Sequence, residues 1–512
     1  MQRSTSPGIV AAQVLTSLAL LASLVGPLDA QVGAIDWVHD PAIAKSGDTY
    51  YLISSGVHAG EMAFLRTSKD LYRWQLVGEI IPELPAWTSA IAPRDGNIWA
   101  PDISFFGGEH RLYYAVSSFG TNKSAIGLLS SKSLDPASPD YHWIDRGKVI
   151  ESRPGTDDWN AIDPNVAFDE AGAPWLVFGS YWTGIKMRKL DAATGRLSAS
   201  DGTLYALASR PGVTSIEAPF IVRAKGRFYL FVSFDQCCVG AQSEYKIYAG
   251  RSTGIKGPYR DREGDDMMQG GGTLVLKGYG KYRGPGHNAV LQDGSRWWLV
   301  HHYYDADQNG LPKLHVRPLY WASDGWPLAG EPLTAPPQDP VEPYPVGTWE
   351  HSVDFEPGGT IKLFSNGRTL SPAAQETWSL SGSELTLRWP NPAAPGGVWI
   401  DGCVLAADGR SYVGRNQIGV IVRGKRVPAK FVRGDGNGDG VVDLSDAVFA
   451  LSYLFQGSAV LSCLKAIDAN DDGVVDIADP IYALGYLFGG GPRIPPPQAP
   501  GGLDTTADDL GC

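Results

Sequence analysis

The chain has 512 residues, which is too long for one ordinary core and predicts two to four domains. Its formal net charge of −12 argues against nucleic acid or an anionic membrane as partner and favours a neutral substrate over a polyanionic one. Five cysteines are few for an exported chain, so we do not expect disulfides to hold the fold together, although Cys237 could bridge to Cys238 and Cys463 to Cys512.

Residues 1–30 predict a signal peptide. Arg3 precedes an apolar stretch from Ile9 to Val25, and Leu28-Asp29-Ala30 fits a signal-peptidase site. The stretch contains polar residues and is too short for a comfortable membrane span, and no cysteine follows the cleavage site to carry a lipid. The sequence therefore predicts a secreted protein, with association with the cell surface left open.

Five segments within residues 31–335 repeat one plan: a short polar motif, an apolar strand, a Gly/Asp turn and an aromatic strand. Units of this kind, rich in short strands, are typical of propeller blades, whose innermost strands surround a central channel. We therefore expect an all-β fold with a five-bladed β-propeller. One polar side chain opens each segment, at spacings of 54 to 70 residues: Asp40, Asp102, Asp163, Glu217 and His287.

The openers should converge on one funnel. A single opener is more simply explained as a turn-capping residue at a strand start, but five in register favour convergence. Clustered carboxylates repel one another, so at least one pKa should rise and leave a protonated acid beside ionised bases. Cleavage of a glycosidic bond needs that pairing, and the region has no GxSxG elbow, HExxH helix or phosphate-binding glycine loop. The sequence thus indicates a glycoside hydrolase.

Several motifs resemble glycoside hydrolase family 43. In chain order they are HDPAI from His39, NIWAPDIS from Asn97, NAIDPNV from Asn160, SIEAPFI from Ser215 and GPGHNAV from Gly284. Two further runs are similar to the endo-α-1,5-L-arabinanase branch of that family: GSYWTGI from Gly179 and FVSFDQCC from Phe231.

The resemblance implies an inverting mechanism with three carboxylates. Asp40 matches the general base, Glu217 the general acid, and Asp163 the group that orients the acid and keeps its pKa high. Base and acid would then stand roughly 6.5–9.5 Å apart to admit a water molecule. His287 matches a histidine that supports a bound ion, usually calcium, through water-filled coordination. Asp102 matches no chemical step, and the implied substrate contacts are Trp99, Phe119, Asn160 and Ser180.

Residues 346–427 predict a small β-barrel or sandwich after a Pro-rich linker, residues 332–345. This segment resembles the β-domain that follows some arabinanase propellers, and a packing role is the simpler interpretation. Residues 491–512 look like a flexible C-terminal tail.

Residues 433–490 contain two loops 33 residues apart that fit paired calcium sites. Each loop has oxygen ligands at positions 1, 3, 5, 9 and 12, a carbonyl at position 7 and glycine at position 6. The first loop offers Asp435, Asn437, Asp439, the Val441 carbonyl, Asp443 and Asp446. The second offers Asp468, Asn470, Asp472, the Val474 carbonyl, Asp476 and Asp479.

An apolar helix is expected after each loop, and the pair resembles a type I dockerin. That resemblance implies a cohesin-like or surface-anchoring partner. The residues after the loops are not the polar pair that often sets the choice of cohesin, so another anchor, or only a folded tail, remains open.

Endo-acting hydrolysis of α-1,5-arabinan is the leading functional hypothesis. An exo-acting α-L-arabinofuranosidase or β-xylosidase would use the same machinery. A non-catalytic sugar-binding propeller used for adhesion is the alternative from another class, and it predicts a missing carboxylate, whereas all three are present.

Overall fold

The computed structural model describes residues 31–512 except 59, 93–96, 338–343, 429, 458, 500, 505 and 507–509. The predicted signal peptide and the middle of the Pro-rich linker therefore lie outside the described residues. Within the described part of the chain, no helix is long and apolar enough to cross a membrane.

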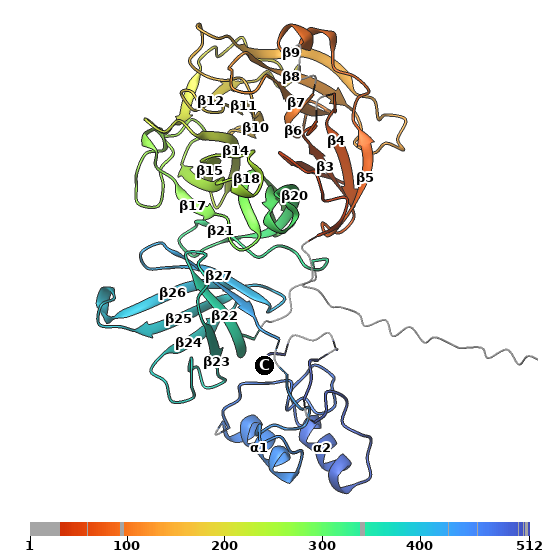
Figure 1. Ribbon diagram of the computed structural model, residues 1–512, viewed down its shortest axis with the longest axis vertical. Coiled ribbons are helices and arrows are strands. Elements are labelled where there is room, and N and C mark those ends of the chain that lie inside the picture. The colour runs from red at the N-terminus through yellow and green to blue at the C-terminus, as the bar shows by residue number, and fades with distance from the viewer. Residues whose placement is uncertain are drawn as a thin grey trace, which may run out of the picture.

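The N-terminal part forms five antiparallel sheets arranged as the blades of a propeller (Figure 1), which confirms the predicted architecture. The inner strands are β2 (Ala42–Ser46), β6 (Trp99–Phe106), β10 (Asn165–Phe168), β14 (Ile216–Ala224) and β18 (Tyr282–Asp293). The second strands are β3 (Thr49–Ser54), β7 (Glu109–Val116), β11 (Pro174–Phe178), β15 (Arg227–Phe234) and β19 (Arg296–Asp305). The third strands are β4 (Phe64–Ser68), β8 (Ser124–Ser131), β12 (Ile185–Lys189), β16 (Lys246–Ser252) and β20 (Leu311–Trp321). The outer strands are β5 (Arg73–Glu79), β9 (Ile144–Ser152), β13 (Tyr205–Ala208), β17 (Thr273–Leu276) and β21 (Pro327–Ala329).

Each inner strand contacts the inner strands of the two neighbouring blades, so the five close a ring around the channel. Each second strand lies inside its blade, between the first and third strands. Its two faces are buried; β11 (PWLVF), for example, is fully buried. This burial explains why they read as continuous apolar runs rather than as alternating ones. Among the described residues, the helices of this part are single 3-10 turns: η1 (Ala86–Ala90), η2 (Gly240–Gln242), η3 (Met267–Gln269) and η4 (Ala306–Gln308).

The first and last blades are joined by the segment that precedes the first inner strand. Strand β1 (Val32–Gly33) pairs in parallel with the outer strand β5 of the first blade. Gln31 reaches the last blade: its side-chain amide donates to Val316 O at 3.0 Å and to Leu333 O at 2.9 Å, and its side-chain oxygen accepts from Val316 N at 3.0 Å. Gln31 is fully buried, so these bonds close the ring in the absence of solvent.

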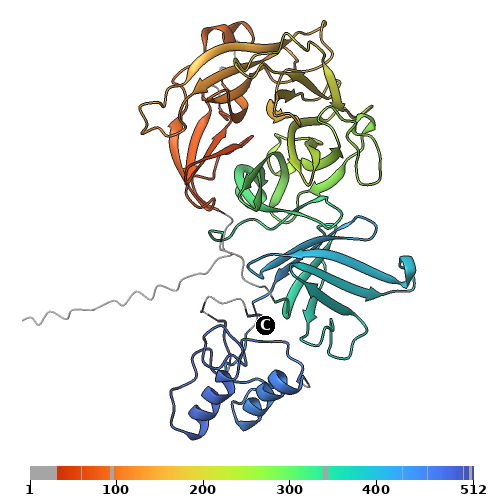
Figure 2. The same cartoon turned by 180° about the vertical axis from the view of Figure 1, so that it is seen from behind.

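Below the propeller lies a single curved sheet of seven antiparallel strands (Figure 2). Its strands are β22 (Gly347–Val353), β23 (Thr360–Leu363), β24 (Thr377–Ser381), β25 (Glu384–Pro390), β26 (Val398–Leu405), β27 (Ser411–Asn416) and β28 (Ile421–Arg426), with η5 (Pro395–Gly397) before β26. The connection between the edge strands β23 and β24 bridges to both of them, through Leu363–Thr369 and Arg368–Thr377. The sheet is therefore closed like a barrel, rather than split into the two layers of a sandwich.

The curved sheet packs on the outer part of the last two blades. Phe355, Val413 and Ile421 share one apolar cluster with Val275 of β17 and Leu328 of β21. The same cluster reaches Ala224, the last residue of β14, at the opposite end of that inner strand from Glu217. This placement agrees with a packing role for the segment.

The last part of the chain holds two helices, α1 (Leu444–Gln456) and α2 (Ala478–Phe488), at the far end from the propeller (Figure 1). Asp443 caps α1 and forms a capping box with Asp446. The residues after α2 were expected to form a flexible tail, and for those that the structure describes this was wrong. Asp504 pairs with Arg433 at 3.0 Å and with Lys465 at 2.7 Å.

Two disulfides complete the fold. Cys463 is bonded to Cys512, whose carbonyl also accepts a hydrogen bond from Thr348 N at 2.7 Å, so the end of the chain is tied back to the curved sheet. The bridge from Cys463 to Cys512 is one that the sequence allowed, whereas the other long-range contacts of the tail involve no regular element that patterning could detect. Cys237 is bonded to Cys238, and Cys403 is a buried free thiol.

Candidate active site

One residue with left-handed backbone marks the point where each inner strand enters the channel: Asp40 (φ 50°), Ala100 (φ 42°), Asp163 (φ 55°), Ala218 (φ 53°) and His287 (φ 48°). In four of the five a proline follows: Pro41, Pro101, Pro164 and Pro219. Non-glycine residues adopt this conformation rarely, and it costs free energy, so its recurrence identifies equivalent positions.

The register assumed from the sequence was therefore wrong for two of the five openers. Asp102 lies two residues beyond the equivalent position, and Glu217 lies one residue before it. Strand pairing is irregular at both places, between Trp99 and Asp102 and between Glu217 and Phe220. Such bulges shift side chains by a residue, which polar-residue matching cannot detect.

Asp40 is buried and held by three donors. His39 Nδ1 lies 2.9 Å and Ser55 Oγ 2.7 Å from its Oδ2, while His287 Nδ1 lies 3.0 Å from its Oδ1. Burial alone would raise the pKa of this carboxyl, but the charges and hydrogen bonds of His39 and His287 outweigh it and hold the pKa well below its usual range. Asp40 is thus ionised, and Oδ1, with one protein partner, keeps capacity to accept a proton.

Glu217 has the opposite electrostatic character. Ser180 Oγ donates to its Oε2 at 2.6 Å, and the buried Tyr245 hydroxyl donates to its Oε1. Burial nevertheless raises the pKa of Glu217, against these two hydrogen bonds. Two neighbouring carboxyls with pKa values displaced in opposite directions form an acid–base pair.

Asp163 links the acid to the ring of inner strands. Its Oδ2 accepts a hydrogen bond from Ala218 N, the residue after Glu217, at 3.0 Å. Burial raises the pKa of Asp163 to about 8, with the charges of Glu217 and Asp40 adding to the rise and His287 opposing it. Because two like charges at this spacing disfavour each other, Asp163 and Glu217 are not both ionised readily, and the pair holds a proton near neutral pH; the modulating role of Asp163 stays a prediction.

His287 contacts Asp40 through Nδ1, and its backbone N–H donates to Ser233 Oγ at 2.9 Å. Burial disfavours its charge, yet Asp40 raises the pKa of His287 to about 9. A histidine whose Nδ1 faces a carboxylate presents Nε2 as a metal ligand, and the surrounding carboxyls favour a cation. These residues therefore fit the predicted ion, whose coordination shell water molecules would have to complete. Calcium at His287 stays a prediction.

Asp102 joins blades instead of entering the acid–base pair. Its Oδ2 accepts from Val166 N at 2.9 Å, and its Oδ1 from Asn165 Nδ2 at 3.2 Å. Asn165, two residues after Asp163, makes the corresponding bond to Ile221 N of the next blade at 2.9 Å. Asp102 and Asn165 are therefore equivalent ties between successive inner strands, which supports a structural role for Asp102.

The four predicted substrate contacts divide into two pairs. Phe119 is 83% exposed, and Trp99 is half-buried with its indole N–H on Asn97 Oδ1, so both rings can meet a sugar. Asn160 and Ser180 are buried and occupied, Asn160 by Ser124 Oγ at 2.6 Å and Ser180 by Glu217. Ser180 thus acts on the acid, and contact of any of the four with sugar stays a prediction.

Sequence reasoning missed the side chains that support the carboxylates: Ser55, Tyr245, His39, His302 and Tyr304. The signal for Ser55 and Ser180 was present, because a serine follows the second strand in the first and third blades. His302 accepts the Asp40 backbone N–H at 3.1 Å, and it stacks on His39 at 4.0 Å between ring centroids. One ligand atom each from His39, Asp40 and His302 lies within 4.8 Å of the others; His39 Nδ1 already faces Asp40 Oδ2 and His302 Nδ1 accepts the Asp40 backbone N–H, while His302 Nε2 has no hydrogen-bond partner among the described residues.

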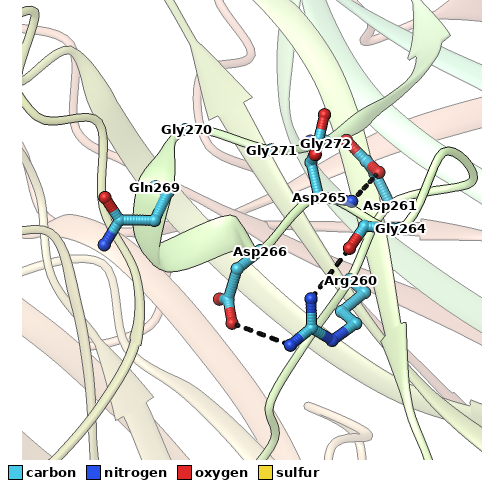
Figure 3. Close-up of a pocket in the computed structure, with 9 residues that line it drawn as sticks. All are labelled: Arg260, Asp261, Gly264, Asp265, Asp266, Gln269, Gly270, Gly271 and Gly272. Atoms are coloured by element: carbon cyan, nitrogen blue, oxygen red, sulfur yellow. Dashed lines mark hydrogen bonds and ion pairs between the residues drawn. The ribbon is translucent and has the colours of Figure 1, made fainter.

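Two surface hollows flank the propeller. A hollow of about 500 Å³ lies in the connection between β16 and β17 (Figure 3). Its Arg260 is engaged by Gly264 O and Asp266, and its Asp261 accepts from Asp265 N, so these groups already have partners. A second hollow of about 450 Å³, which includes Trp182, lies on the carboxylate side next to the Ser180 loop.

The two acidic loops near the C-terminus have the same internal bonds. Asp435 accepts from Asp439 N at 3.1 Å and from Gly440 N at 2.9 Å. Asp468 accepts from Asp472 N and Gly473 N, both at 3.2 Å. Asp446 and Asp479, at position 12 of their loops, each accept two backbone N–H groups.

Among the buried carboxyls of these loops, Asp468 lies 3.6 Å from the Arg433 guanidinium, and the pKa values of three of them are still raised. Burial raises the pKa of Asp446, of Asp468 and, to about 7, of Asp479, with neighbouring aspartates adding to the rise. No three carboxylates of either described loop come within 4.8 Å of one another. A divalent cation would draw them together and relieve the repulsion, so the donor set fits calcium.

Comparison with known proteins agrees with this site. Residues 35–327 match the model of glycosyl hydrolases family 43. The chain is 41% identical to an extracellular exo-α-(1→5)-L-arabinofuranosidase of Cellvibrio japonicus, over 61% of this chain and 92% of that protein. It is 42% identical to an extracellular endo-α-(1→5)-L-arabinanase of Bacillus subtilis, over 61% of this chain and 95% of that protein.

Among solved structures, an α-L-arabinanase of Cellvibrio cellulosa in complex with arabinohexaose is similar, with a TM-score of 0.55 and 41% identity over 58% of this chain and 95% of that chain. Fold, carboxylates and relatives together define a glycoside hydrolase. The chain belongs to glycosyl hydrolase family 43, with relatives that are arabinanases and arabinofuranosidases.

Proposed function

We propose that this protein is a secreted, endo-acting, inverting hydrolase of α-1,5-linked L-arabinan. The observation that carries the proposal is the arrangement of two buried carboxyls whose partners shift their pKa values in opposite directions, downward for Asp40 and upward for Glu217. The named activities of the two relatives, at 41% and 42% identity, both concern α-(1→5) linkages of arabinose. Both relatives are also named extracellular, which supports secretion.

Asp40 and Glu217 perform the two proton transfers of the proposed reaction. Asp40 Oδ1 takes a proton from water as the water attacks the anomeric carbon, while Glu217 gives its proton to the departing sugar oxygen. Asp163 binds the backbone N–H next to Glu217 and repels a second negative charge there, and Ser180 and Tyr245 fix the orientation of the Glu217 carboxyl. An ion at His287 Nε2, when bound, would supply positive charge to a channel lined by acids.

An open surface beside the acid favours endo action. The second hollow includes Trp182, 36% exposed and two residues from Ser180, together with the apolar Leu204 and Pro211. Exposed indole rings stack on sugar faces, so polymer units beyond the cleaved bond have a place to bind. Exo-acting α-L-arabinofuranosidase activity is the second candidate, since a relative of almost equal identity has that activity, whereas nothing in the site favours β-xylosidase or a non-catalytic adhesion propeller.

The product profile distinguishes endo from exo action. On linear arabinan we expect viscosity to fall faster than reducing ends accumulate, with a ladder of oligosaccharides as early products, and on debranched arabinan the same pattern. Release of a single small product from the first minutes, with viscosity falling in proportion, would show exo action. Preferential hydrolysis of xylan would contradict the substrate.

We also propose that residues 433–490 form a calcium-dependent, dockerin-like docking module. Both helices expose three apolar side chains at positions that correspond under the repeat of 33 residues. In α1 they are Leu444 (51% exposed), Val448 (53%) and Phe455 (69%). At and after the N-cap of α2 they are Ile477 (44%), Ile481 (60%) and Phe488 (71%). Duplicated exposed apolar side chains are typical of a surface that a partner covers.

A cohesin-like protein with an apolar face is the partner that this proposal specifies. We expect a cohesin panel to contain a binder in calorimetry with calcium, and Phe455→Ser with Phe488→Ser to abolish that binding while helicity is retained. Absence of binding by every cohesin, or binding unchanged by the double substitution, would contradict the docking role.

A further inference from the structure

A chain of hydrogen bonds connects the vicinal disulfide to Asp40. Cys238 N donates to the Tyr304 hydroxyl at 3.0 Å, and that hydroxyl lies 2.7 Å from His39 Nε2. On its other side, His39 Nδ1 lies 2.9 Å from Asp40 Oδ2. Three segments far apart in sequence thus meet at one carboxylate oxygen.

The donors in this chain can be assigned. The Tyr304 oxygen accepts from Cys238 N, so the hydroxyl proton is free to donate to His39 Nε2. With Nε2 as acceptor, the ring proton of His39 lies on Nδ1, where it donates to Asp40. Tyr304 is 3% exposed and has no solvent alternative, so the tautomer of His39 is fixed by protein groups.

We propose that Tyr304, oriented by the Cys237–Cys238 turn, is a positioning residue that fixes His39 and, through it, the oxygens of Asp40. The inference deepens the proposed function and rests on the role of Asp40 as general base. Oδ2 takes two donors, His39 and Ser55, which leaves Oδ1 toward the attacking water. Loss of His39 as a donor would let the carboxyl rotate and misplace that lone pair.

The disulfide is placed to hold the first donor of the chain. Cys238 has left-handed backbone (φ 68°), and its Sγ lies 3.9 Å from His39 Nε2. The turn before it is anchored by Asp235, which accepts from Arg210 at 2.8 Å and also pairs with Lys246. Anchored at Asp235 and closed by the disulfide, the turn presents Cys238 N to Tyr304.

Steady-state kinetics on linear arabino-oligosaccharides test the inference. Tyr304→Phe should lower kcat roughly 10-fold and His39→Ala roughly 100-fold, with KM little changed, because misplaced reacting groups affect the chemical step. His39→Asn should restore most of the activity, since the amide Nδ2 takes the place of Nδ1 as donor. Adding Tyr304→Phe to His39→Asn should cost little more, because an amide has no tautomer to fix.

The choice of leaving group separates this role from a merely structural one. With a nitrophenyl leaving group on an arabino-oligosaccharide, Tyr304→Phe should remain impaired, because the base is needed whatever departs. Ser180→Ala, which acts on the acid, should recover, because a good leaving group needs no proton. Recovery of Tyr304→Phe on this substrate would overturn the assignment.

The two disulfides supply a matched pair of variants. Cys237→Ser with Cys238→Ser should lower kcat as Tyr304→Phe does, and the combination of all three should be no worse. Cys463→Ser with Cys512→Ser should leave kcat unchanged, because that bond lies in the C-terminal part.

The inference would be overturned if Tyr304→Phe and the Cys237/Cys238 double variant both kept the wild-type kcat. It would also be overturned if Tyr304→Phe lowered kcat as much in the His39→Asn background as in the wild-type background. Asp40→Asn distinguishes this failure from failure of the proposed function. An inactive Asp40→Asn beside active positioning variants refutes only the inference, whereas an active Asp40→Asn removes the base assignment itself.

Discussion

Asp40 and Glu217 are similarly buried, but their pKa values shift in opposite directions because their partners differ. Asp40 faces His39, His287 and Ser55, which favour the ionised form. Glu217 faces two hydroxyls and a neighbouring carboxyl, and its burial is not offset by a cation in direct contact. The identity of the contacting atoms, more than depth in the protein, thus divides base from acid.

The pH dependence of kcat/KM follows from the acid. The pKa values of Glu217 and Asp163 are raised, that of Asp163 to about 8, so activity should fall as pH rises through this range and the acid loses its proton. Tyr245→Phe removes a hydrogen bond that favours the carboxylate, so it should move the alkaline limb to higher pH. An alkaline limb that stays in place in Tyr245→Phe, or moves lower, would contradict the role of Glu217.

The sequence located the three carboxylates but not the residues that set their protonation. Asp40, Asp163 and Glu217 stand in recognisable local motifs, whereas Ser55 and Tyr245 reach them across the fold. The prolines that follow four of the five left-handed residues indicate the register of the blades better than the acidic side chains do. The reason is that bulges displace Asp102 and Glu217 from the equivalent positions.

At the scale of elements, the two acidic loops are built alike because their sequences repeat at every ligand position. Position 1 accepts backbone N–H groups that turn the loop, and position 12 caps the same loop from the start of the following helix. These loops could be predicted from sequence because the bonds that shape them are local, although Arg433 also contacts the second loop from 35 residues away. The closed form of the seven-stranded sheet could not, because it depends on bridges between its edges.

Stability of the C-terminal part should depend on pH only without calcium. The folded-state pKa of Asp479 is raised to about 7, so its stabilising effect is present below the unfolded value and is lost as pH rises through about 7. In EDTA, the unfolding temperature of this part should therefore fall between pH 4 and pH 7.5, and calcium should reverse the fall.

Asp479→Asn serves as the matched variant for this effect. It should stabilise the calcium-free form near pH 7.5 and weaken calcium binding, as should Asp446→Asn in the first loop. Far-UV circular dichroism that ignores both EDTA and these substitutions would contradict the calcium assignment.

At the scale of the whole molecule, the propeller closes through a segment that comes before its first blade. Sequence reasoning found the blades from their repetition, but the closing segment does not repeat, and only its buried bonds reveal it. The curved sheet packs against the outer strands of the last two blades.

Gln31→Ala tests the closure. The substitution removes three buried hydrogen bonds and leaves Val316 N without its side-chain acceptor in a dry interface, at a cost of about 1–3 kcal/mol, while the carbonyls of Val316 and Leu333 each keep a backbone donor. We expect the unfolding temperature of the propeller to fall by several degrees, as followed by calorimetry. Val32→Ala, at a neighbouring exposed position, is the control and should cause little change; equal effects from the two variants would refute the closing role of Gln31.

The stereochemistry of the product tests the central claim, that Asp40 activates water while Glu217 protonates the leaving oxygen in a single displacement. Proton NMR of a linear α-1,5-arabino-oligosaccharide, recorded as hydrolysis begins, should show new reducing ends first as the β-furanose, with the α-anomer growing later by mutarotation. New reducing ends that appear first as the α-furanose would mean a covalent intermediate and would contradict the account.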